Sequence, residues 1–212
     1  MTVKSLSLNP GIRQRQAGYT LIELSISLAI IAVLLVGTLT GVQRLLRSNN
    51  ANNTISTTQA ALTNITKLYA TVSEPSIYTT TNLINMGVWD SSAVTPAVGT
   101  TPAFVKHPFG GRINVAANTA AIGAAGVNQA AAGSGYWYRL GGIPSESCAS
   151  VATSMQNTAA AIYVASATTA GGATPTGTNA GYKVPGANNV TANLAGACAS
   201  ADTVEISLFI LS

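Results

Sequence analysis

An acidic side chain at the start of a long apolar segment constrains this chain more than any other feature. Glu23 precedes an uncharged run from Leu24 to Val42. As a helix, these nineteen residues would span roughly 28 Å, close to the hydrocarbon thickness of a bilayer. A charge in such a segment costs about 2.5–3.5 kcal/mol near its centre and less toward its end. Glu23 therefore needs a partner, and no basic residue lies within reach on the same helix.

A cut between Gly18 and Tyr19 would supply such a partner, namely the new α-amine of the same chain or of a neighbouring subunit. The segment GYTLIELSISLAIIAVLL, which begins at Gly18, resembles the cleavage site and hydrophobic helix of type IV prepilins. The resemblance implies that a prepilin peptidase cuts after Gly18 and methylates Tyr19, the new first residue. It also implies that Glu23 pairs with a neighbouring subunit's amine during filament assembly.

Three departures from the type IVa branch favour the type IVb branch of this family. Tyr19 replaces the phenylalanine that is usual in the type IVa branch. Thr40 occupies a position where that branch has a helix-kinking proline. The leader, residues 1–18, is also longer than type IVa leaders usually are.

A secretory signal and an uncleaved membrane anchor are the alternatives for this segment. A secretory signal has a short apolar region followed by a cleavage site of small residues. Here the apolar run is too long, carries Glu23 and continues into GTLTGVQRLL without a convincing site of that kind. The uncleaved anchor is disfavoured by the specificity of the Gly-Tyr-Thr-Leu-Ile-Glu junction.

The charge of the chain argues against a nucleic-acid-binding protein. The formal net charge is +4, but three of the ten basic residues, Lys4, Arg13 and Arg15, lie in the leader. Without them, seven basic and six acidic side chains leave a net charge of +1. By count alone, too few basic side chains remain for a patch that could bind nucleic acid. A basic leader before an apolar helix instead follows the positive-inside rule, which exports the rest of the chain.

The apolar helix is expected to continue beyond the membrane, from about Thr20 to Ala70. An apolar or small stripe at spacings of 3, 4, 3 and 4 should pack on a sheet. Its members are Ile55, Thr58, Leu62, Ile65 and Tyr69. The stretch from Ser48 to Thr58 is rich in poor helix formers. Glu74-Pro75 should terminate the helix, because the residue before proline avoids the α region.

An antiparallel sheet is predicted in the rest of the chain. The β-forming and alternating segments fall at residues 107–117, 135–142, 160–167 and 202–212, the last in the centre of the sheet. A helix should begin with Ser145 as N-cap and run to about Asn157. Residues 79–90 should form a short helix or loop with five buried anchors, Leu83, Ile84, Met86, Val88 and Trp89. Loops are expected over residues 118–135 and 168–201. The fold class is therefore α+β.

Cys148 and Cys198 are the two cysteines of the chain. Their separation, without accompanying histidine or further cysteine, excludes a zinc site built from this chain alone. In an exported domain a disulfide is the natural interpretation, with two buried thiols as the alternative.

Several segments of the globular part carry a second resemblance. LINMGVW, HPFGGRINV, GIPSESCASVATSM and the closing C-x4-TVEISLF pattern resemble PilS-type and other type IVb pilins. In those proteins a long N-terminal helix packs on an antiparallel sheet, and a disulfide closes a C-terminal D-region. The resemblance therefore implies a type IV pilin fold, with the disulfide joining Cys148 to Cys198.

Catalytic signatures are lacking in the sequence. His107 has no cysteine or carboxylate cluster near it in the chain and is expected to be a loop residue. No phosphate-binding loop, dinucleotide fingerprint or nucleophile elbow occurs. An enzyme, a cofactor and a metal site are therefore not expected. Trp137, Tyr136 and Tyr138 are expected in core or subunit packing rather than in glycan or receptor binding.

The resemblance implies a structural subunit of a type IVb-like pilus, serving adhesion or conjugative cell contact. The expected divisions are a leader (1–18), a transmembrane and assembly helix (19–42), its amphipathic continuation (43–72) and a globular pilin domain (73–212). Implied partners are other pilin subunits, prepilin peptidase, the pilus assembly ATPase and the inner-membrane platform protein. The chain would lie in the inner membrane and then in an extracellular pilus. Alternatives are a minor pilin, a type II secretion pseudopilin and an anchored adhesin whose loop over residues 168–201 binds a surface.

Overall fold

The computed structural model describes residues 19–70, 77–119, 131–166, 180–183 and 191–211. The chain forms two compact units, Met1–Arg44 and Leu45–Ser212, each with its own internal contacts. Two sequence-based expectations lie outside the described residues: the leader with Gly18, and the role of Glu74-Pro75 in ending the long helix.

Helix α1 runs over Leu21–Tyr69 and has 49 residues, close to the predicted bounds. The stretch rich in Asn, Ser and Thr is helical throughout. Threonine hydroxyls in this stretch donate to carbonyl oxygens one turn earlier, Thr54 to Asn50 at 2.7 Å and Thr57 to Asn53 at 2.8 Å. These bonds satisfy the side chains within the helix.

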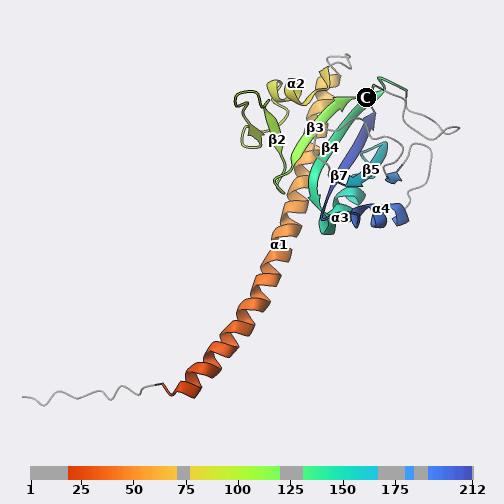
Figure 1. Cartoon of the computed structure of the whole chain (residues 1–212). Coiled ribbons are helices and arrows are strands. Elements are labelled where there is room, and N and C mark those ends of the chain that lie inside the picture. The colour runs from red at the N-terminus through yellow and green to blue at the C-terminus, as the bar shows by residue number, and fades with distance from the viewer. Residues whose placement is uncertain (1–18, 71–76, 120–130, 167–179, 184–190, 212) are drawn as a thin grey trace, which may run out of the picture. The chain divides into compact units, whose positions relative to one another are not determined.

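The second unit is built around an antiparallel sheet of seven strands (Figure 1). The strands are β1 (Val94–Thr95), β2 (Phe104–Lys106), β3 (Arg112–Ala117), β4 (Gly135–Pro144), β5 (Ala161–Ser166), β6 (Ala180–Lys183) and β7 (Thr203–Leu211). Their order is β1-β2-β3-β4-β7-β5-β6, so the C-terminal strand is central, as predicted. The pairing of β4 with β7 shifts register between Leu140 and Ile143, where Gly142 takes a φ of 78°.

The C-terminal half of α1 and one face of the sheet form the main core together. The buried residues of α1 are Ala51, Thr54, Thr58, Ala61, Leu62 and Ile65. The predicted stripe is therefore correct at its centre, with Ile55 and Tyr69 half-buried at its two ends. The sheet contributes alternate residues of β4 and β7, among them Tyr136, Tyr138, Leu140, Ile206 and Leu208. Period-2 alternation places these side chains on a single face.

Tyr138 lies fully buried in this core. Its hydroxyl oxygen accepts a hydrogen bond from Nε1 of Trp89 at 3.4 Å. Burial raises the pKa of Tyr138 to about 12, and the hydrogen bond from Trp89 opposes that rise. The expected role of Tyr136, Trp137 and Tyr138 in packing is confirmed, because each is at most 2% exposed.

Three shorter helices complete the described part: α2 (Thr80–Asn85), α3 (Ser145–Ser154) and α4 (Thr191–Cys198). Thr79 caps α2, its side chain accepting from the backbone nitrogen of Asn82 at 3.2 Å. Ser145 was predicted to cap α3, and this was wrong. Strand β4 extends to Pro144, which takes the N-cap position without a side-chain bond, so Ser145 is already helical.

Two other expectations fail. Met86 is 44% exposed rather than buried, because it follows α2 as the C-cap while Leu83 and Val88 fill the core. The segment over residues 168–201 is not one loop, since it contains β6 and α4. The Ala/Gly/Thr-rich composition of this segment gives no clear signal for β6 or α4. Both depend on contacts with other parts of the chain, because β6 pairs with β5 and α4 ends at the disulfide-bonded Cys198.

Candidate assembly segment

The N-terminal turn of α1 places a carboxylate next to a helix cap. The backbone N–H of Glu23 donates to Oγ1 of Thr20 at 3.4 Å, and the N–H of Leu24 donates to the carbonyl of Thr20 at 3.1 Å. Thr20 is thus the N-cap, and Glu23 occupies the third helical position, the spacing of a capping box. Tyr19, immediately before the cap, is 80% exposed. The predicted residues Tyr19 and Glu23 therefore lie at one accessible helix end.

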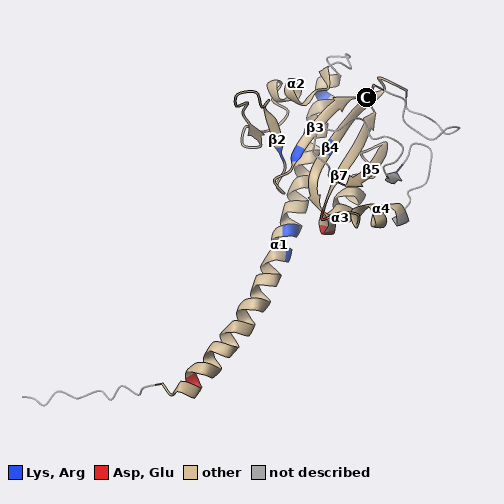
Figure 2. Cartoon of the chain, in the orientation of Figure 1, with Lys and Arg blue, Asp and Glu red and all other residues tan. Residues whose placement is uncertain are grey.

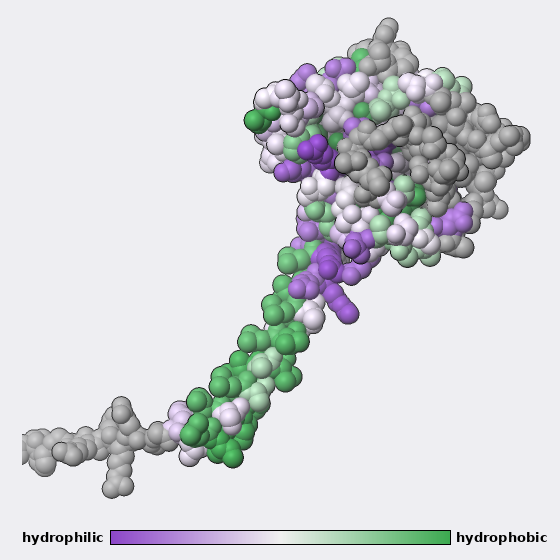
Figure 3. Space-filling view, viewed as in Figure 1, coloured by the Kyte–Doolittle hydropathy of each residue, from purple (hydrophilic) through white to green (hydrophobic). Residues whose placement is uncertain are grey.

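The first unit exposes an apolar helix over most of its length (Figure 3). From Leu21 to Val42, the large apolar side chains are 50–88% exposed. Among the described residues, α1 is the one helix long and apolar enough to cross a membrane. In water this surface would be strongly unfavourable at about 25 cal/mol per Å². It therefore requires either lipid or other apolar helices around it.

The hydroxyl groups within this apolar run are satisfied by the helix itself. Ser25 donates to the carbonyl of Ile22 at 2.8 Å, and Ser27 donates to that of Glu23 at 2.9 Å. Thr38 and Thr40 donate to carbonyls three or four residues earlier. Such bonds let hydroxyl side chains enter an apolar environment without unpaired donors. From Tyr19 to Val42, Glu23 is the one charged side chain.

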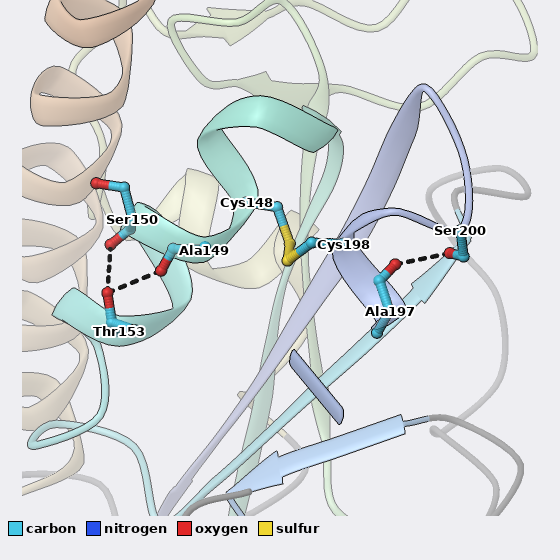
Figure 4. Close-up of a disulfide and its surroundings, with 7 residues drawn as sticks. All are labelled: Cys148, Ala149, Ser150, Thr153, Ala197, Cys198 and Ser200. Atoms are coloured by element: carbon cyan, nitrogen blue, oxygen red, sulfur yellow. Dashed lines mark hydrogen bonds between the residues drawn. A yellow bond between two sulfur atoms is a disulfide. The ribbon is translucent and has the colours of Figure 1, made fainter. Parts of the chain in front are cut away.

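A disulfide joins Cys148 on α3 to Cys198 on α4 (Figure 4). Both cysteines are at most 6% exposed, and 50 residues separate them in sequence. Figure 4 also shows hydroxyl bonds at the two helices, from Thr153 to the carbonyls of Ala149 and Ser150 and from Ser200 to that of Ala197. The interpretation of these cysteines as two buried thiols is therefore excluded, and the disulfide ties two elements to the same core.

An exposed ion pair connects α1 with α3 in the second unit. The guanidinium of Arg47 bonds to the carboxylate of Glu146, whose side chain is 65% exposed. Figure 2 shows basic positions on α1 and an acidic position on α3. Exposed pairs of this kind contribute about 0–1 kcal/mol. The pair therefore contributes little to the stability of the unit.

His107 lies in the turn between β2 and β3 and is buried, only 3% exposed. Nδ1 accepts from the backbone N–H of Phe109 at 3.3 Å, and Nε2 lies 2.8 Å from the carbonyl oxygen of Gly141. The neutral ring therefore carries its proton on Nε2 and donates it to Gly141. Burial lowers the pKa of His107, and the bond to Gly141 opposes that shift. The imidazole joins the turn to β4, which is a structural role.

The described residues contain no group of three or more histidine, cysteine or acidic side chains that could hold a metal ion. A pocket of about 470 Å³ lies between α1 and the segment from Gly87 to His107. Its lining includes Asp90 and Lys106, but His107 is already engaged with Gly141.

Comparison with known proteins identifies the N-terminal segment. Residues 13–39 match the family described as the prokaryotic N-terminal methylation motif. The match spans the Gly18-Tyr19 junction, Glu23 and most of the apolar run. No curated protein matches the chain.

Two of the similar solved structures align with about three quarters of this chain. The type IV b pilin from Salmonella typhi is 19% identical with a TM-score of 0.51, and the alignment covers 76% of this chain and 99% of that chain. TcpA, a type IV pilin from Vibrio cholerae El Tor biotype, is 15% identical with a TM-score of 0.45, over 77% of this chain and 98% of that chain. The first likeness shows that the chain has the fold of a type IVb pilin.

These findings define the chain as one with an N-terminal methylation motif followed by a globular unit that has the fold of a type IVb pilin. The methylation motif and the pilin fold together support a type IV prepilin of the IVb branch. The predicted resemblance to this branch is thereby confirmed, and so is the α+β fold. The structure itself confirms the disulfide. Cleavage after Gly18, methylation of Tyr19 and the pairing of Glu23 stay predictions.

Sequence reasoning missed one feature of this segment and one of the globular unit. The cap by Thr20 was not predicted, although Thr-x-x-Glu before an apolar run is a known start signal for a helix. The second is a cationic cluster of Phe104, Lys106 and Arg112 on β2 and β3, which depends on the pairing register of the two strands.

Proposed function

We propose that this chain is made as a prepilin and matures by cleavage between Gly18 and Tyr19, followed by methylation of the Tyr19 amine. The match of residues 13–39 to the N-terminal methylation motif supports this step. Tyr19 lies just before the helix cap and is 80% exposed, so a peptidase can reach the bond before it. The mature subunit would be held in the inner membrane by residues 19–42, with the amphipathic helix and globular domain outside.

The mature chain is proposed to act as the structural subunit of a type IVb-like pilus. The observation that carries this function is an exposed apolar helix with one carboxylate in its first turn, attached to a pilin-type globular unit. In a filament, apolar helices of many copies replace lipid around one another. Glu23 then meets the amine of a neighbouring Tyr19, and a wrong register leaves this carboxylate unpaired in an apolar bundle.

The proposed partners follow from this assembly route. They are further copies of the chain, a prepilin peptidase, an assembly ATPase and an inner-membrane platform protein. The subunit is proposed to leave the inner membrane and become part of a pilus on the cell surface. Adhesion and conjugative contact are the proposed uses of the fibre.

Replacement of the carboxylate tests this assembly mechanism. Glu23→Val should enter the membrane at normal levels but give few or no sheared pili. Glu23→Gln, which keeps the shape and removes the charge, should resemble Glu23→Val, whereas Glu23→Asp should retain part of the yield. Immunoblots of the membrane and sheared fractions measure the two quantities. Normal pilus yield from both uncharged variants would refute the role of Glu23.

A further inference from the structure

Two cations are placed directly opposite each other on neighbouring strands. Lys106 of β2 and Arg112 of β3 are cross-strand partners, and both side chains are exposed. Like charges in this position destabilise a sheet. Charged residues make up only 8% of the chain, so this pair is not the by-product of a generally charged surface. Figure 2 shows the two basic positions on β2 and β3.

An aromatic ring holds both cations. The Lys106 ammonium lies 5.5 Å from the centroid of the Phe104 ring, and the Arg112 guanidinium lies 4.1 Å from it. Phe104 and Lys106 are two residues apart on β2, so their side chains leave the sheet on the same face. The ring attracts each cation through its π face and limits the freedom of the guanidinium. This arrangement keeps the Lys106 and Arg112 charges close together, so that one anionic group could contact both.

Neither Lys106 nor Arg112 forms an ion pair with a carboxylate in the part of the chain that the structure describes, and Asp90 lines the pocket of about 470 Å³ together with Lys106. The ion pair found there joins Arg47 to Glu146, in another part of the unit. A pocket of about 420 Å³ lies beside the cluster and is lined by Phe104, Arg112, Thr81 and Asn114, among others. Asn114 follows Arg112 by two residues on β3 and thus lies on the same face of the strand. Guanidinium, hydroxyl and amide donors therefore border one cavity.

We propose that Phe104, Lys106 and Arg112 form a docking site for the phosphate groups of an anionic surface polymer. The planar fork of arginine binds two oxygens of a phosphate at once, and lysine acts as a point charge for the same or the next group. Phosphate is favoured over carboxylate because it presents more acceptor oxygens to the several donors around the pocket. The site is separate from Glu23 and does not depend on filament formation.

Binding to the full-length chain in a neutral detergent tests this site, with fluorescently labelled polyphosphate and inorganic phosphate as probes. Polyphosphate should bind more tightly than inorganic phosphate, since one polymer engages both cations. Its affinity should fall as salt rises, because each contact releases counterions. Lys106→Gln and Arg112→Gln should each weaken polyphosphate binding roughly tenfold, the size expected for a charge-assisted contact. The double variant should lose more than either single variant.

Lys67→Gln is the matched control, because Lys67 is another exposed lysine of the same unit that lies on α1. It should leave the affinity within twofold of the unmodified chain. The proposal is overturned if polyphosphate does not bind at low salt, if the double variant binds normally, or if Lys67→Gln weakens binding equally. Binding of alginate in place of polyphosphate would overturn the assignment to phosphate. Pilus yield is not part of the readout, so failure here leaves the assembly proposal unaffected.

Discussion

The hydroxyl oxygen of Thr20 accepts a hydrogen bond from the backbone nitrogen of Glu23, and this bond closes the first turn of α1. A negative side chain in the first turn of a helix is favourable, because the unpaired N–H groups there form the positive end of the helix dipole. Glu23 therefore contributes to the helix start before any neighbouring subunit arrives. Experiments on Glu23 must separate this local role from pairing with an amine.

A variant that removes only the Thr20 cap separates the helix-start role of Glu23 from its pairing with an amine. Thr20→Ala should weaken the first turn by about 0.5–1 kcal/mol, at the low end for N-caps because the 3.4 Å bond is long. Amide exchange of Glu23 in detergent micelles should then accelerate roughly two- to fivefold. Thr20→Ser keeps the hydroxyl and should exchange at the original rate. If Thr20→Ala abolished pili as completely as Glu23→Val, the cap rather than the carboxylate would control assembly.

Loss of the disulfide should destabilise the globular unit. In the chain-entropy account, closing a loop of this length stabilises by about 4 kcal/mol. The double variant Cys148→Ala/Cys198→Ala should lose a free energy of unfolding of this order. Guanidinium unfolding followed by tryptophan fluorescence measures it, since Trp89 and Trp137 both lie in this unit. An unchanged midpoint would show that the packing of α3 and α4 suffices without the bond.

Gly111 is required by the close approach of two strands. A Cβ atom at this position would lie 1.8 Å from the carbonyl oxygen of Gly141 and 2.5 Å from Nε2 of His107. Gly111→Ala should therefore cost about 1–3 kcal/mol of folding free energy through overpacking. The control is Gly196→Ala in α4, where an added Cβ meets nothing within 4 Å and should be neutral or stabilising. Equal midpoints for the two variants would contradict this account.

The buried imidazole predicts a loss of stability in acid. Burial lowers the pKa of His107 in the folded state below its unfolded value of about 6.5. Between the folded-state and unfolded-state pKa values, the unfolded chain binds more protons than the folded chain. The contribution of His107 to the free energy of unfolding is therefore complete above about pH 6.5, and it declines as the pH falls through the folded-state pKa. His107→Gln, which cannot titrate, should flatten this decline. Unfolding midpoints at pH 7 and pH 5 measure this decline. If His107→Gln loses as much stability between these pH values as the unmodified chain, groups other than His107 cause the decline.

The elements with strong periodicity were predictable from the sequence. The stripe around Leu62 and Ile65 identified the buried face of α1, and the alternation in residues 135–142 identified β4. Short or weakly apolar elements were not predictable. Strand β1 has two residues, and β6 and α4 lie in an Ala/Gly/Thr-rich segment that carries little signal. Their structure depends on pairing with β2 and β5 and on the bond of Cys198, which are long-range contacts.

The candidate assembly segment could be proposed from the sequence because its residues are local, and the motif match covers residues 13–39. Gly18, Tyr19 and Glu23 fall within six consecutive residues, and the apolar run follows directly. The contact of His107 with Gly141 spans 34 residues, and the pairing of Lys106 with Arg112 requires a specific register of β2 and β3. Neither contact has a sequence motif. Both depend on the pairing register of the sheet, which composition and periodicity leave open.

Mass spectrometry of the N-terminus of the mature protein tests the central claim most directly. The proposal places the α-amine of Tyr19 beside the Glu23 carboxylate of another copy, which requires a cut after Gly18. Protein from sheared surface filaments should yield an N-terminal peptide that begins at Tyr19 and carries one added methyl group. A peptide that retains Met1, or one that begins beyond Val42, would leave Glu23 without this partner and would contradict the account.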